Sequence, residues 1–147
     1  MLVTKQAFIS RQTAFLNHVK ATPYYIDLET VSAKPTPAGK AEGFDIAAFV
    51  GDSNRESVTY RFHALYEKEI TDRMREKYGL PREVNGIVYL SPRQLTPVYG
   101  DYHLDWNKTK VHFEGRVQVI NHIVYLEEMY GSCIGVQIFV KDDNKGG

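Results

Sequence analysis

Three runs of β-forming residues in the second half of the chain constrain the fold most. Residues 110–113 alternate apolar and polar side chains, residues 117–126 are rich in β-branched types, and residues 134–140 alternate again. Gly115 lies between the first two runs, and a reversal at 127–131 separates the last two. The pattern predicts three consecutive antiparallel strands.

The beginning of the chain has the periodicity of a helix. Thr4 is a suitable N-cap, and a stripe of apolar side chains follows it at spacings of three or four, which predicts a helix over residues 5–20. Pro23 ends this helix, because a proline excludes the preceding residue from helical geometry. Aromatic and β-branched residues at 24–31 then predict a strand.

A loop and a further strand are expected next. Residues 32–43 contain two prolines and two glycines and no large apolar side chain, which predicts an exposed loop. The apolar run at 44–50 predicts a strand, and the turn residues at 51–54 end it. Residues 58–60 look extended.

A second helix is predicted over residues 62–78. Large apolar side chains recur there every four residues in a charged background, at Phe62, Tyr66, Ile70, Met74 and Tyr78. The charges between them have mixed signs, which favours a face in contact with solvent. The alternative is that this face packs on a neighbouring subunit.

Short strands are predicted at 87–90 and 98–104, the second of them after Pro97. The order of elements has no regular β-α-β alternation, so a parallel doubly wound sheet is disfavoured. We therefore expect one α+β domain over residues 1–147. Its core would be an antiparallel β-barrel or sheet with the helices at 5–20 and 62–78 packed outside, and residues 142–147 would be a frayed polar tail.

Composition narrows the class of protein. Hydrophobic residues make up 43% and charged residues 24% of the 147 residues, as in ordinary globular domains. The formal net charge is +0, so no overall charge favours a polyanion or an anionic membrane. With neither an apolar stretch of about 18 residues nor a signal-peptide pattern at its start, the protein is expected to be soluble and not exported.

Few residues suggest chemistry. His103 and Asp105 would lie on the same side of a strand, where they could serve a metal or an acid–base pair, but a polar strand end is the favoured interpretation. The single cysteine, Cys133, is more plausible as a small buried residue than as a nucleophile. Residues 37–40 resemble a phosphate loop only superficially, because the preceding glycine and following hydroxyl are missing. The aromatic residues favour a core or an interface over base stacking. No catalytic residue, metal ligand or cofactor is predicted.

One resemblance rests on the order of motifs in residues 86–141. GIVYLSP at 86–92 is followed by PVYGDY at 97–102, VHFEGRVQVI at 111–120, and a hairpin that ends with IFV at 138–140. This order resembles the late part of small tailed-bacteriophage neck proteins of the head-closure or stopper class. In that class a short strand, a turn and a strand-glycine-strand unit build a β-barrel.

The resemblance implies a virion subunit without enzymatic activity, assembled in the host cytoplasm. Copies of the chain would form a ring that joins the capsid portal to the tail, and double-stranded DNA would pass through it without sequence-specific contacts. Portal, adaptor or tail proteins would be its other partners, and no membrane is implied. The loop would contact the lumen or a neighbouring ring through Lys34, Pro35, Pro37, Gly39 and Lys40.

Two other functions remain open at this point. One is a small-molecule or nucleotide-binding accessory protein that uses tyrosines, Trp106 and His103 in a cleft. The other is a small enzyme centred on His103 and Asp105.

Overall fold

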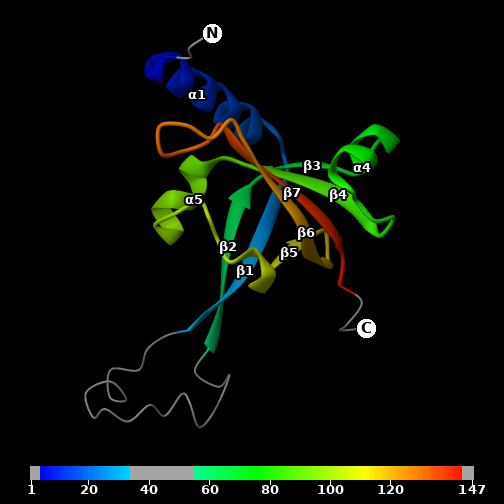
Figure 1. Cartoon of the computed structure of the whole chain (residues 1–147). Helices are drawn as coiled ribbons and strands as arrows, with labels where there is room; N and C mark the ends of the chain where they lie inside the picture. The colour runs from blue at the N-terminus through cyan, green and yellow to red at the C-terminus, as the bar shows by residue number, and fades with distance from the viewer. Residues whose placement is uncertain (1–3, 34–54, 144–147) are drawn as a thin grey trace, which may run out of the picture.

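A computed structural model describes residues 4–33 and 55–143 (Figure 1). The elements in chain order are α1 (Lys5–Ala21), β1 (Tyr25–Ala33), β2 (Arg55–His63), β3 (Leu65–Glu67), α4 (Asp72–Tyr78), β4 (Val84–Leu90), α5 (Pro92–Tyr99), the 3-10 helix η2 (Trp106–Lys108), β5 (Thr109–Phe113), β6 (Arg116–Leu126) and β7 (Gly135–Asp142). The predicted strand at 44–50, the loop beyond residue 33 and the tail from residue 144 lie outside the described residues.

The strands of the described residues form one antiparallel sheet in the order β2-β1-β5-β6-β7-β4-β3. The sheet curls into a half-barrel (Figure 1), which confirms the predicted α+β class with a mainly antiparallel sheet. The meander β5-β6-β7 matches the three strands that the sequence predicts, and Gly115 adopts the left-handed backbone conformation of its turn, with φ of 79°.

The two edge strands of the sheet follow each other directly in the chain. β2 and β3 lie at opposite ends of the strand order, but only Ala64 separates them in sequence. Ala64 is fully buried, and its backbone N–H donates to the Tyr24 carbonyl at 3.1 Å. Its carbonyl accepts a hydrogen bond from the Thr22 hydroxyl at 2.8 Å, so the backbone at this corner is satisfied without strand partners. The corner closes one end of the half-barrel.

The helices occupy three different places around the sheet (Figure 1). α1 lies against β4 and β7 near the β6–β7 hairpin. α4 packs on the outer face through Met74 and Tyr78, over buried Ile87 and Phe139. α5 lies beside the β2 edge, where the Tyr99 ring is 6.0 Å from the Phe62 ring. No helix in the described ranges has the length and apolar character needed to span a membrane.

The interior of the half-barrel is an apolar core. It contains inward-facing side chains of all the long strands and is closed by Leu95 of α5 and by Trp106 of η2. Cys133 is fully buried there, which confirms its predicted place as a small core residue.

The predicted helix at 62–78 is wrong over residues 62–71. Residues up to His63 belong to β2, Leu65–Glu67 form β3, and only Asp72–Tyr78 are helical. A spacing of four fits a strand as well as a helix, because it is also a multiple of two. Phe62 and Tyr66 accordingly share the inner face with Ala64 between them, whereas Met74 and Tyr78 pack outside the sheet.

The predicted strand at 98–104 is also wrong, because α5 (Pro92–Tyr99) includes its first two residues and the rest are not in a strand. Ser91 caps this helix in a capping box with Gln94, and Pro92 occupies its first turn, where a missing N–H costs nothing. Gly100 ends the helix in the left-handed conformation with φ of 81°. Pro97 inside the helix removes one backbone hydrogen bond without ending it.

Candidate functional site

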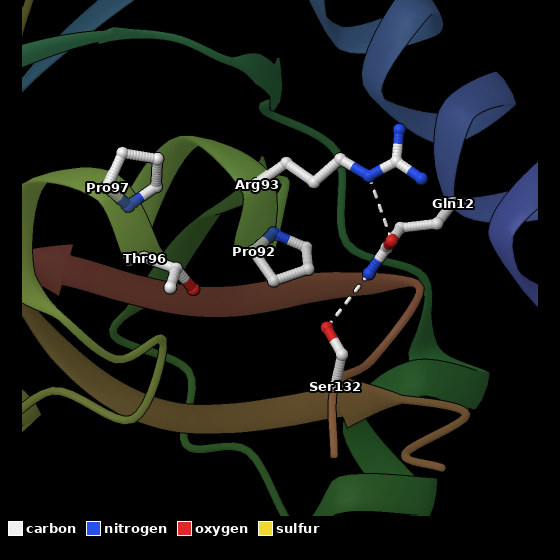
Figure 2. Close-up of a pocket in the computed structure, with 6 residues that line it drawn as sticks. All are labelled: Gln12, Pro92, Arg93, Thr96, Pro97 and Ser132. Atoms are coloured by element: carbon white, nitrogen blue, oxygen red, sulfur yellow. Dashed lines mark hydrogen bonds between the residues drawn. The ribbon is translucent and has the colours of Figure 1, made fainter. Parts of the chain in front are cut away.

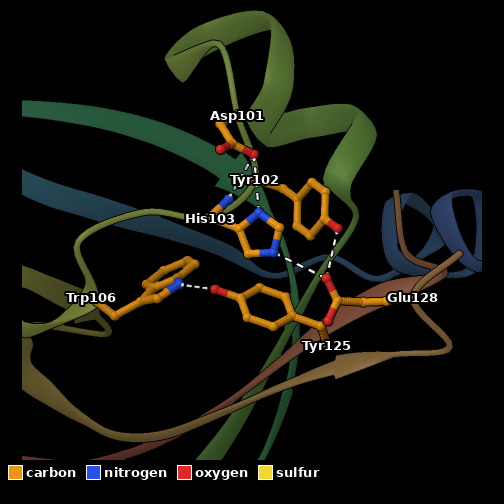
Figure 3. A network of polar contacts seen from close by, with 6 residues as sticks. All are labelled: Asp101, Tyr102, His103, Trp106, Tyr125 and Glu128. Atoms are coloured by element: carbon orange, nitrogen blue, oxygen red, sulfur yellow. Dashed lines mark hydrogen bonds and ion pairs between the residues drawn. The ribbon is translucent and has the colours of Figure 1, made fainter. Parts of the chain in front are cut away.

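His103 lies in the segment between α5 and η2, where it joins this segment to the β6–β7 reversal (Figure 3). Its Nδ1 is 3.2 Å from Asp101 Oδ1, and its Nε2 is 3.0 Å from Glu128 Oε2. The Tyr102 hydroxyl donates to the same Glu128 oxygen at 2.8 Å. The imidazole therefore has a carboxylate at each ring nitrogen.

The carboxylates of this cluster are held in the charged form. The hydrogen bond from Tyr102, followed by that from His103, lowers the pKa of Glu128 below its ordinary value. The backbone N–H of His103 does the same for the pKa of Asp101. Burial, with Glu128 alongside, raises the pKa of Tyr102. At neutral pH neither carboxylate has a proton to donate, so the arrangement suits cross-linking better than acid catalysis.

Aromatic packing fills the space around His103. Its ring lies 4.0 Å from the Tyr102 ring and 4.6 Å from the Tyr125 ring, and Trp106 Nε1 donates to the Tyr125 hydroxyl at 2.7 Å (Figure 3). Tyr102 and Trp106 are only 6% and 9% exposed. These side chains pack on one another, so the aromatic residues at this position serve as a small extension of the core.

The predicted pairing of His103 with Asp105 is replaced by another one. Asp105 lies 3.8 Å from Lys108 Nζ, whereas His103 contacts Asp101 and Glu128. Glu128 was not predicted as a partner of His103, because it is distant in the chain and reaches His103 only through the β6–β7 hairpin. The acidic residues within the predicted reversal at 127–131 were the available signal.

A second polar cluster connects β1 to its two neighbours. The Ser57 hydroxyl donates to Glu29 Oε2 at 2.6 Å, and His112 Nε2 lies 2.7 Å from Glu29 Oε1. Glu29 is thus between the serine and the histidine. A nucleophilic serine needs the histidine directly beside it, so this order of groups is suited to holding strands together.

Cys133 is equally unsuited to nucleophilic chemistry. Burial raises the pKa of its thiol to about 12, so the reactive thiolate is scarce at neutral pH. Among the described residues, no group of three or more His, Cys, Asp or Glu side chains is placed to hold a metal ion.

A third polar cluster joins α1, α5 and the β6–β7 hairpin (Figure 2). Arg93 donates to Gln12 Oε1 at 2.9 Å and to the Thr13 hydroxyl at 2.7 Å. Gln12 in turn donates to the Ser132 hydroxyl at 2.9 Å and to the Cys133 carbonyl at 2.8 Å. A shallow hollow of about 370 Å³ lies beside it, lined also by Pro92, Thr96 and Pro97. The hydrogen bonds already occupy Gln12, so the cluster is a structural junction.

The strand pair β1–β2 is the most unusual feature of the surface. The two strands pair along their whole length, from Tyr25↔His63 to Ala33↔Arg55. Only residues Asp27–Thr30 of β1 also pair with β5, so within the described ranges the last three residue pairs have ladder contacts with each other alone. Figure 1 shows this two-stranded arm extending past the end of β5. A two-stranded ribbon is marginally stable by itself in water.

The predicted loop residues Lys34, Pro35, Pro37, Gly39 and Lys40 belong to the 34–54 segment, which connects the two strands of this arm and lies outside the described residues. The phosphate-loop-like residues 37–40 lie there as well. The structure therefore describes the base of the arm that carries the predicted contact loop.

Comparisons with known proteins give no family for the chain. No family model matches the sequence, and a search of curated proteins finds no significant match.

Proposed function

We propose that the protein is a structural subunit without enzymatic activity, which works as a ring of identical copies in the neck of a tailed bacteriophage. The arm formed by β1 and β2 is the observation that carries the proposal. A two-stranded ribbon that leaves the sheet gains stability when another surface covers it. In a closed ring a neighbouring copy supplies that surface at every position.

The phage assignment rests on the resemblance of residues 86–141 to head-closure proteins. The described part of this region contains β4, α5 and the β5-turn-β6 unit in the same order as the motifs. In such a ring the 34–54 segment would project from the arm toward the lumen or an adjacent ring, through Lys34, Pro35, Pro37, Gly39 and Lys40. Double-stranded DNA would pass through the centre, and the net charge of +0 suits a channel that must release its cargo.

The polar clusters support a structural function over an enzymatic one. The side chains with catalytic chemistry, His103, His112 and Ser57, bond to carboxylates that connect separate elements. Each cluster thus contributes to rigidity, which a load-bearing subunit needs.

Light scattering combined with negative-stain imaging tests the proposal. We expect the full chain to form hollow rings as its concentration rises. The matched control replaces residues 31–57 by an Asn-Gly turn, which joins the Thr30↔Val58 pair directly and leaves the β1–β5 pairing intact. This variant should retain the melting temperature of the half-barrel within a few degrees but lose the ring. A compact monomer at every concentration, or a ring that survives the deletion, would contradict the proposal.

A further inference from the structure

The helix α4 carries a hollow that the proposed function does not use. It is about 430 Å³ in volume and is lined by Arg73, Met74, Lys77 and Tyr78. Tyr78 forms the inner wall, because its ring lies 5.2 Å from the Phe139 ring and 5.6 Å from the His122 ring of the sheet. The hollow therefore has a rigid apolar base with two cations at its rim.

Among the described residues, the two cations have no acidic partner. In the part of the chain that the structure describes, neither Arg73 nor Lys77 has a carboxylate within ion-pair distance; the Lys77 ammonium instead lies 5.3 Å from the centre of the Tyr78 ring. Both side chains belong to exposed residues. They are free to bind an anion without first giving up an ion pair.

The charges of α4 lie on neighbouring sides of the helix. Arg73 and Lys77 are four residues apart and share one side, while Asp72 and Glu76 are four residues apart on the adjacent side. The repulsion between like charges at this spacing is offset by opposite charges three residues apart, such as Arg73 and Glu76. Of the four residues that line the hollow, the two charged ones are both cations.

We propose that this hollow docks an acidic peptide segment that carries an aliphatic or aromatic anchor residue. The anchor would pack on Met74 and Tyr78, and flanking carboxylates would pair with Arg73 and Lys77. Arginine binds a carboxylate through two parallel N–H groups, which fixes the orientation of the segment. Two cations provide too few phosphate contacts for tight binding of a nucleic acid at physiological salt. The sugar-phosphate backbone would also make no use of the apolar base of the hollow. A peptide is therefore the occupant that fits both parts of the hollow.

Fluorescence anisotropy with a labelled peptide tests the inference on the full-length protein. The probe is a short peptide of Asp and Glu residues around a central Leu-Phe pair. The Arg73→Gln/Lys77→Gln variant should bind it about tenfold more weakly than the unsubstituted protein. The matched control, Asp72→Asn/Glu76→Gln, changes charge on the adjacent side of the same helix and should bind at least as tightly. Amide NMR shifts on peptide addition should be centred on α4.

Three results would overturn the inference. The first is no binding by the unsubstituted protein, or equal binding by the Arg73→Gln/Lys77→Gln variant. The second is equal binding of a peptide in which Ser-Ser replaces Leu-Phe, since the hollow would then provide charge alone. The third is tighter binding of a single-stranded oligonucleotide that displaces the peptide, which would reassign the surface to nucleic acid.

Discussion

The two halves of the sheet are stabilised in different ways. The outer face of β6-β7-β4 is covered by α4, and Phe139 beneath that helix is fully buried. The outer face of β2-β1-β5 has no such cover among the described residues and is held by polar pairs between strands, such as Asp27 with Arg61. The covered half is the rigid body of the molecule, and the polar half is the part from which the arm extends. A partner can cover this uncovered face without displacing any described element of the fold.

The largest effect is expected in the covered half. Phe139→Ala removes a fully buried ring from beneath α4 and should lower the free energy of unfolding by about 3–5 kcal/mol. Urea denaturation measures this change. Val117→Ala, on the exposed outer face of β6, is the control and should cost less than about 1 kcal/mol. Equal losses for the two variants would show that α4 does not protect the sheet.

An intermediate effect is expected where α1 is joined to α5. Arg93→Ala removes donors to Gln12, Thr13 and the Ile9 carbonyl, and leaves the buried Gln12 oxygen without its partner. The free energy of unfolding should fall by about 1–3 kcal/mol. The control is Arg11→Ala, which breaks an exposed ion pair with Glu127 and should cost at most about 1 kcal/mol. Thermal unfolding of both variants distinguishes a junction from a surface contact; a loss no larger than that of the control would count against the junction.

The smallest effect is expected in the polar half, and it depends on pH. The hydrogen bond from Arg61 lowers the pKa of Asp27 from 3.8, and the hydrogen bonds from Ser57 and His112 lower that of Glu29 from 4.5. Carboxyl groups with lowered pKa values stabilise the fold fully above their unfolded values of 3.8 and 4.5, and this contribution is lost as the pH falls through the lower folded values.

The Asp27→Asn/Glu29→Gln variant tests this dependence. Its melting temperature should be only a few degrees below that of the unsubstituted protein at pH 7, because exposed pairs contribute little. The difference should shrink as the pH is lowered below 4.5, since the unsubstituted protein then loses the same interactions. A difference that is independent of pH would show that the two carboxylates do not stabilise the strands through their charge.

The sequence predicts the β5-β6-β7 meander better than the β2–β3 corner, for a physical reason. Strands β5, β6 and β7 follow one another through short turns, so local signals such as Gly115 are sufficient to locate them. The β2–β3 corner depends on pairing with strands distant in sequence, and the spacing of Phe62 and Tyr66 does not distinguish a strand from a helix. The capping box at Ser91 is a readable signal for α5, whereas the prediction placed a strand directly after Pro97, a residue that lies inside this helix.

The polar clusters show the same limit. His103 could be singled out from the sequence, but its partner Glu128 depends on the shape of the β6–β7 reversal, in which Glu127 and Tyr130 adopt positive φ angles of 50° and 54°. Positive φ angles are uncommon for residues other than glycine, so the sequence does not predict this conformation. The prediction that these residues carry no catalytic function remains a prediction.

The corner at Ala64 has a mechanical consequence. In an open sheet, a pull on an edge strand peels it away from its neighbour while the far edge is unaffected. Here tension along β2 passes through the covalent bonds at Ala64 directly into β3, so both margins of the sheet take up the load together. The half-barrel is therefore joined at both margins by the main chain, and it opens only when the β1–β2 ladder or the β3–β4 ladder is broken.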